Sequence, residues 1–152
     1  MTMTTTKTRC AICGERAIVP SNDPVTVELR VGTYTVEGFE YTHCNACGED
    51  FHPIGQSDEM RMEASRMARA EFGLLQPEEI RGLRHDLGLT QRALEEILGV
   101  GEKTVARWER GIYPQSRTAD TLMRLVWAHP ELIAETGFVA REGRGPYRAR
   151  GE

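Results

Sequence analysis

Two cysteine pairs with the same spacing constrain the fold of this chain more than any other feature of its sequence. The pairs are Cys10-Ala11-Ile12-Cys13 and Cys44-Asn45-Ala46-Cys47, and they hold all four cysteines of the 152 residues. A two-residue spacer closes a tight turn that points both sulfurs at one centre, so two such knuckles supply the four soft ligands that zinc accepts. We therefore expect one structural Zn2+ per chain, ligated by Cys10, Cys13, Cys44 and Cys47.

The residues after each pair repeat as well. Gly14-Glu15 and Gly48-Glu49 complete two copies of C-x-x-C-G-E, and glycine suits the left-handed turn that ends a knuckle. A thioredoxin-like redox site needs one C-x-x-C beside a βαβ pattern, and a catalytic zinc needs an open coordination position, so both are disfavoured. His43 and His52 flank the second knuckle, and we interpret them as surface residues or neighbours of the ligands.

The segment between the knuckles has the pattern of β-strands. Apolar and polar residues alternate over residues 25–31, and β-prone residues continue over residues 34–41 with a turn at Glu37-Gly38. We expect a small antiparallel sheet that brings the knuckles together in a zinc-binding domain, residues 1–57. A unit of about 55 residues has little core, so the metal must supply much of its stability.

A helical segment follows this domain. Ser57 or Asp58 can cap a helix over residues 58–72, in which Met60, Ala64 and Met67 belong to an apolar stripe at helical spacing. We assign residues 58–75 to a connecting helix and linker. This helix either packs lightly on one domain or offers a face to a partner.

Short helices separated by glycines follow over residues 76–140, which we predict to be an all-α domain. Pro77 opens the first helix, Thr90 caps the second and Ser116 caps the fourth. The third is expected over residues 102–110, a short turn after the second, which is the arrangement of a helix-turn-helix.

The third helix has a basic face and an apolar face. At 100° per residue, Lys103, Arg107 and Arg110 fall on one side, while Val105 and Trp108 fall on the other. The basic side is predicted to enter the major groove of double-stranded DNA, where Lys103 and Arg107 contact bases and Arg110 neutralises phosphate. The predicted DNA-binding set also includes Thr104, at the edge of this face, and Arg117, as a phosphate contact.

The charge distribution agrees with DNA binding although the total does not. The chain has a net charge of −4, yet four basic residues and one acid lie between Lys103 and Arg117, and the local field at a docking face matters more than the total. Residues 141–152 form a basic tail, which is either a flexible solubilising segment or an arm that contacts DNA.

Other classes are disfavoured by what the sequence lacks. No apolar run approaches the ~18 residues of a membrane helix, and the polar N-terminus has no signal core. We therefore expect a cytoplasmic protein, where thiols stay reduced. Paired carboxylates, a nucleophile elbow and a phosphate loop are missing, so we do not expect an enzyme.

Two sets of residues resemble known families. Gly88-Leu89-Thr90-Gln91 and Val105-Ala106-Arg107-Trp108-Glu109-Arg110-Gly111 resemble the XRE/Cro-type helix-turn-helix. Together with the double C-x-x-C module and His129-Pro130-Glu131-Leu132, they resemble the MqsA family of antitoxins, which carry a YgiT-type zinc finger.

This resemblance implies a two-domain antitoxin. The zinc domain would neutralise an mRNA-cleaving endoribonuclease toxin, and the helical domain would dimerise and repress its own operon at a palindromic operator. Lys103 and Arg107 would take the base-reading positions, and Gln91 the position that contacts phosphate or a base edge. The alternative is a free-standing XRE-type regulator whose zinc module dimerises or recruits another protein.

Overall fold

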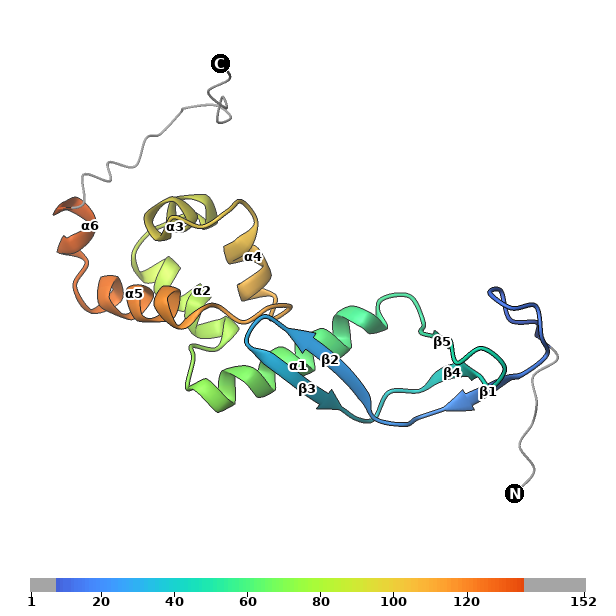
Figure 1. Cartoon of the computed structure of the whole chain (residues 1–152). Helices are drawn as coiled ribbons and strands as arrows, with labels where there is room; N and C mark the ends of the chain where they lie inside the picture. The colour runs from blue at the N-terminus through green and yellow to red at the C-terminus, as the bar shows by residue number, and fades with distance from the viewer. Residues whose placement is uncertain (1–7, 136–152) are drawn as a thin grey trace, which may run out of the picture.

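The structure, a computed structural model, describes residues 8–135 as an elongated molecule with a β-structure at one end and a helical bundle at the other (Figure 1). The elements in chain order are β1 (Ile18–Ser21), β2 (Val25–Leu29), β3 (Gly32–Val36), β4 (Tyr41–Cys44), β5 (Asp50–Phe51), α1 (Gln56–Phe72), α2 (Pro77–Asp86), α3 (Gln91–Leu98), α4 (Thr104–Glu109), α5 (Arg117–Ala128) and α6 (Glu131–Glu135). The predicted fold class is confirmed. The predicted basic tail, residues 141–152, lies outside the described residues.

The strands form two antiparallel sheets, whereas the sequence predicted one. The knuckle sheet has the order β1-β4-β5, with Ile18 opposite Cys44, and the β2–β3 hairpin pairs Val27 with Tyr34. After Val36 the chain leaves the hairpin, and the next strand, β4, pairs with β1 rather than with β3. This pairing places the second knuckle beside the first.

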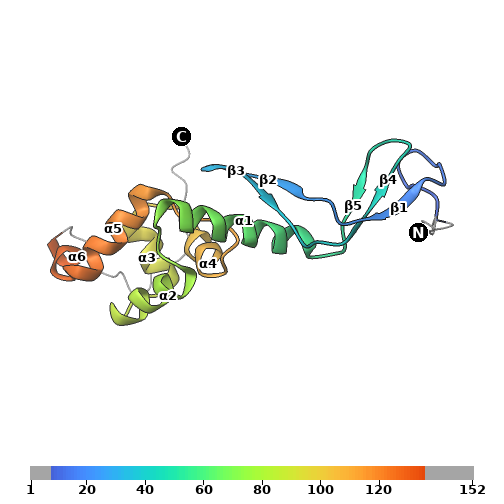
Figure 2. The same cartoon turned by 90° about the horizontal axis from the view of Figure 1, so that it is seen from below.

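Helix α1 packs far more closely than a connector would. It begins at Gln56, and Gly55 with φ 90° occupies the N-cap position in place of the predicted Ser57 or Asp58. Its buried apolar side packs on the hairpin in a cluster of Tyr34, Val36, Met60, Ala64 and Ala68. Figure 2 shows α1 running along the hairpin and on into the bundle. In the described part of the chain, no helix is both long and apolar enough to cross a membrane.

The helical bundle has its own apolar core, and α2, α3 and α5 begin where the sequence predicted. Thr90 and Ser116 accept hydrogen bonds from the backbone N–H groups of Ala93 and Ala119, and Pro77 is the first residue of α2. The buried cluster consists of Leu75, Ile80, Leu83, Leu94, Val105, Trp108, Ala119 and Met123. Trp108 is therefore part of the core that holds α4 to the bundle, as its place on the apolar face of the helix predicted.

Candidate metal centre and nucleic-acid interface

The two knuckles have the same local hydrogen bonds, as their repeated sequence predicted. The N–H of Cys10 donates to Glu15 O at 2.8 Å, and the N–H of Cys44 donates to Glu49 O at 2.9 Å. In both turns the following glycine is left-handed, with φ 77° at Gly14 and φ 78° at Gly48. Each knuckle thus closes the same turn and aims its two thiols in the same way.

The knuckle sheet brings the four thiols to one point. The sulfurs of Cys10 and Cys47 lie 3.7 Å apart, as do those of Cys13 and Cys44, and all four Sγ atoms lie within 4.8 Å of one another. A tetrahedral ion with metal–sulfur bonds of about 2.3 Å, the length for zinc, sets its ligand sulfurs about 3.8 Å apart. The cluster therefore fits a four-coordinate metal ion.

The thiols also influence one another's ionisation. The backbone N–H of Cys13 is the main cause that lowers the pKa of Cys10 to about 7. For Cys47 the backbone N–H of Glu49 lowers the pKa, but burial and the three neighbouring thiols outweigh it and raise the pKa to about 12. Four thiolates cannot form together unless a cation replaces the protons, which is the chemistry of a metal site.

The two histidines next to the second knuckle have partners outside the cysteine cluster. His43 Nδ1 lies 2.7 Å from Asp50 Oδ1, and His52 Nδ1 lies 3.1 Å from Gln56 Oε1. The cluster of potential metal ligands among the described residues consists of the four cysteines. This agrees with the interpretation of both histidines as neighbours rather than ligands.

The recognition helix is shorter than the sequence predicted. Helix α4 spans Thr104–Glu109, and Lys103, expected inside the helix, is its N-cap in a left-handed conformation with φ 62°. Among residues 8–135, it is the one non-glycine residue with positive φ. The helix starts late because the left-handed backbone of Lys103, which immediately precedes α4, is not helical.

Most of the predicted DNA-contacting residues lie at the surface of the protein. Lys103, Arg107, Arg110 and Arg117 are exposed, and Thr104 is half-buried. Glu109, the acid within this segment, is 4% exposed. All exposed charges from residue 103 to residue 117 are therefore positive, although the net charge of the whole chain is −4.

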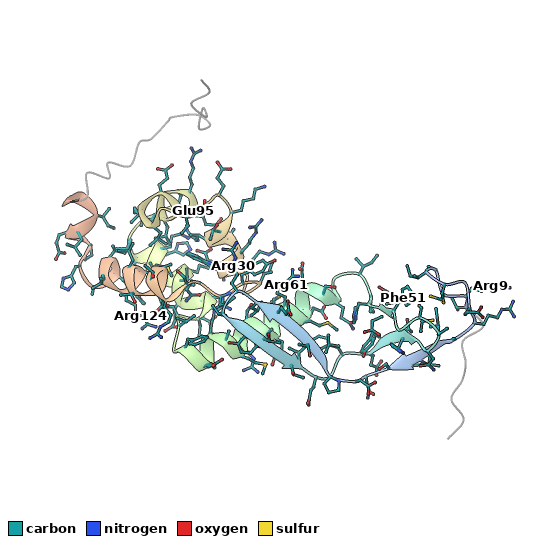
Figure 3. All side chains as sticks on the ribbon, in the orientation of Figure 1. Arg9, Arg30, Phe51, Arg61, Glu95 and Arg124 are labelled. Atoms are coloured by element: carbon teal, nitrogen blue, oxygen red, sulfur yellow. The ribbon has the colours of Figure 1, made fainter. Side chains whose placement is uncertain are left out.

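A buried carboxylate caps the recognition helix from the neighbouring helix. Glu95 projects from α3 (Figure 3), is 6% exposed, and its Oε1 accepts the N–H of Val105 at 3.0 Å. Lys103 makes no side-chain capping bond, so α3 supplies the acceptor that the N-terminus of α4 otherwise lacks. The two helices of the helix-turn-helix are thereby fixed to each other.

A second carboxylate ties three helices together at the other end of α4. Glu109 accepts two hydrogen bonds from Arg84, at 2.6 and 3.2 Å, and one from Gln91 Nε2 at 2.8 Å. Burial raises the pKa of this carboxyl, but the bonds from Arg84 and Gln91 outweigh burial and hold the pKa below its usual range. Gln91 is thus oriented by Glu109 at the start of α3, while its residue remains exposed.

Sequence reasoning missed Glu95, Glu109 and Arg84 as parts of this site. All three are charged residues on short helices, and their hydrogen-bond partners lie on other elements or beyond a turn of the chain. Glu109 could have been found from the sequence, because it lies within the helix-turn-helix motif at residues 105–111.

Comparison with known proteins agrees with both halves of this geometry. The family described as the antitoxin component of bacterial toxin-antitoxin systems, MqsA, matches residues 8–137. Antitoxin MqsA of Escherichia coli (strain K12) is 26% identical over 128 residues, which cover 84% of this chain and 98% of that protein. The family match includes the knuckles, α1 and the helical bundle.

Proposed function

Since this chain belongs to the MqsA family of antitoxins, we propose that it neutralises an mRNA-cleaving toxin and represses its own operon as a dimer bound to a palindromic operator. An antitoxin of this family is a binding and regulatory protein and not an enzyme. The free-standing regulator is the weaker reading, because the family match extends through the knuckle end as well as the helix-turn-helix.

The zinc-binding domain, residues 1–57, is proposed to hold one structural Zn2+ and to bind the toxin. The sulfur separations of 3.7 Å within the thiol cluster support this choice of ion. Four thiolates leave no position for substrate, so the metal would hold the knuckles together and take no part in a reaction. A reducing cytoplasm is the compartment in which this site keeps its thiols.

The DNA-binding domain, residues 76–140, is proposed to read the operator through α4. The observation that carries this proposal is the wholly positive exposed charge of residues 103–117 around a helix that Glu95 and Glu109 fix at both ends. Lys103, Thr104 and Arg107 would face base edges. Gln91, Arg110 and Arg117 would contact phosphate or the edge of the site.

An Arg107→Ala substitution tests the reading of bases. Its affinity for operator DNA should fall by about 1–3 kcal/mol, with much less change on random DNA, because a bidentate base contact is lost. Arg66→Ala is the matched control, since Arg66 is exposed on α1 and paired with Glu63 at 2.6 Å. Fluorescence anisotropy with both DNAs measures the difference. An equal loss of affinity for operator and random DNA would show that Arg107 contacts phosphate rather than bases.

The dimer and the toxin have separate tests. Footprinting should show two protected half-sites about one helical turn apart, or a multiple of it, and a single isolated half-site would contradict the dimer. Co-purification from the native host should capture a small ribonuclease on the full chain. If metal and DNA are bound but no toxin is recovered, the free-standing regulator gains support.

A further inference from the structure

Glu95 contacts the chain on both sides of the turn between α3 and α4. Its backbone carbonyl accepts the N–H groups of Gly99 and Val100, the latter at 3.0 Å, where α3 ends. Its carboxylate Oε1 accepts the N–H of Val105 at 3.0 Å, in the first turn of α4. One residue of α3 therefore holds the end of its own helix and the beginning of the next.

The carboxylate of Glu95 is committed to this bond. The residue is 6% exposed, and the ion pairs within the described part of the chain do not include it. A buried polar group is costly unless it is hydrogen-bonded, and the first N–H groups of a helix have no acceptor in their own helix. The bond between Glu95 and Val105 satisfies both requirements. The N-terminus of a helix also favours a negative charge.

The next residue of α3 shows the ordinary behaviour of an acid on a helix surface. Glu96 is exposed, and its Oε1 lies 3.2 Å from Nε of Arg92, one turn earlier. Two adjacent acids thus differ in burial and in partner. Only Glu95 of this pair is directed at the recognition helix.

The N-cap residue of α4 does not cap its own helix. Thr90 and Ser116, at the N-caps of α3 and α5, each accept an N–H of the first turn through the side chain. Lys103 stands in the same position of α4, but an ammonium group has no acceptor, and no side-chain capping bond is formed. Among residues 8–135, no partner forms a hydrogen bond or ion pair with its amine. The exposed side chain of Lys103 is therefore free.

We propose that Glu95 is a positioning residue, which caps α4 from α3 and thereby leaves Lys103 free to read the operator. A Ser, Thr, Asp or Asn at position 103 would commit its side chain to the helix backbone, whereas a lysine can extend to guanine O6 and N7. Glu95 keeps the first turn of α4 ordered although the N-cap residue is a lysine. For operator binding, this inference rests on the DNA-binding function proposed above. For the cap, it rests on the geometry at Glu95 alone.

The first experiment measures the cap by amide hydrogen exchange in the full chain without DNA. The N–H of Val105 should be protected in the wild type, and Glu95→Ala should lower this protection roughly 2- to 30-fold, which corresponds to the loss of an N-cap bond. Glu95→Gln should keep most of the protection, because its amide oxygen still accepts. Glu96→Ala is the matched control and should leave the protection of Val105 unchanged. The amides of α2 and α5 report whether the fold is intact.

The second experiment compares operator DNA with random DNA. Glu95→Ala should weaken operator binding roughly 2- to 30-fold, because only molecules with an ordered first turn of α4 are competent to bind it. Random DNA should show a much smaller change. Removal of a negative charge would by itself strengthen DNA binding, and Glu96→Ala measures that contribution. Leu94→Ala removes a fully buried neighbour but not the cap, so the folded variant should keep the wild-type ratio of operator to random affinity.

The two experiments fail in different ways. A Val105 N–H that exchanges freely in the wild type, or that Glu95→Ala leaves protected, would overturn the cap. If Glu95→Ala does not fold, the exchange of Val105 in the wild type decides alone.

The remaining results separate this proposal from the proposed function. Equal losses on operator and random DNA, or a loss that Glu95→Gln does not restore, would overturn the positioning role and leave the DNA function intact. A wild type that ignores its own promoter DNA at low salt, yet loses protection at Val105 when Glu95 becomes alanine, would refute the DNA function and leave the cap established.

Discussion

The knuckle sheet and the helical bundle are small units stabilised by different means. The buried hydrophobic cluster of the knuckle sheet consists of Cys10, Ile18 and Cys44, so two of its three members are also potential metal ligands. The apolar core cluster of the bundle has eight buried residues, none of which belongs to the thiol cluster. The core of one unit is its metal site, whereas the core of the other needs no metal. The chain thus uses an ion where its sequence provides too few apolar side chains.

The largest test of this difference is metal removal. Structural zinc contributes on the order of 10–16 kcal/mol in small peptides, so Cys44→Ser or a chelator should unfold β1, β4 and β5. The bundle should keep its helical signal and its unfolding midpoint. The hairpin should also persist, because Tyr34 and Val36 pack on α1 rather than on the knuckles. Metal analysis and amide spectra of the full chain measure both effects.

Ala46→Ser is the matched control for Cys44→Ser, since it changes an exposed residue inside the same knuckle. It should keep both metal and sheet. Native amide shifts in β1 and β4 after complete metal removal would show that the knuckle sheet has a sufficient core of its own. The two units would then not differ in their need for metal.

The converse test weakens the bundle and leaves the metal. Leu94 is fully buried in the bundle core, and Leu94→Ala should lower the free energy of unfolding by about 2–5 kcal/mol. Leu125→Ala, on a residue 47% exposed, should change it by about 0.5 kcal/mol or less. Urea unfolding followed by helical signal measures the difference. A loss of bound metal in Leu94→Ala would mean that the two units are not independent.

Lowering the pH should destabilise the helical bundle because it protonates Glu109. Its pKa is held below its usual range by Arg84 and Gln91 despite burial, so its stabilisation is complete above the unfolded pKa of about 4.3 and is lost as pH falls through the folded value. Glu109→Gln should cost about 1–3 kcal/mol at neutral pH and should flatten the pH dependence below that range. Unfolding of metal-free protein at several pH values measures it. A slope unchanged from the wild type would assign acid sensitivity to other carboxylates.

Local signals predicted much of this structure, and long-range partners account for what they missed. The knuckle turns, the strand alternation of β2 and the caps at Thr90 and Ser116 depend on a few neighbouring residues. Arg69 was not predicted as buried because its acceptor Gly111 lies 42 residues away. The pairing of β4 with β1 was missed for the same reason, since a strand's sequence does not specify its partner.

The smallest expected effect concerns the same backbone turn at the two ends of the molecule. The knuckles place glycine in the left-handed conformation, at Gly14 and Gly48, whereas the recognition helix places Lys103 there with φ 62°. A left-handed conformation costs a residue with a side chain about 1–2 kcal/mol, and glycine loses about 0.5–1 kcal/mol of that gain to chain entropy. Lys103→Gly should therefore stabilise the bundle by about 0.5–1 kcal/mol and still weaken operator binding, because the base contact proposed for Lys103 would be lost. Gly99→Ala is the reciprocal control: at φ 65°, with nothing within 4 Å of an added Cβ, it should only destabilise. If Lys103→Gly instead lowers the unfolding midpoint, the lysine side chain stabilises the fold. The left-handed backbone at this position would then not be a cost in stability that DNA binding explains.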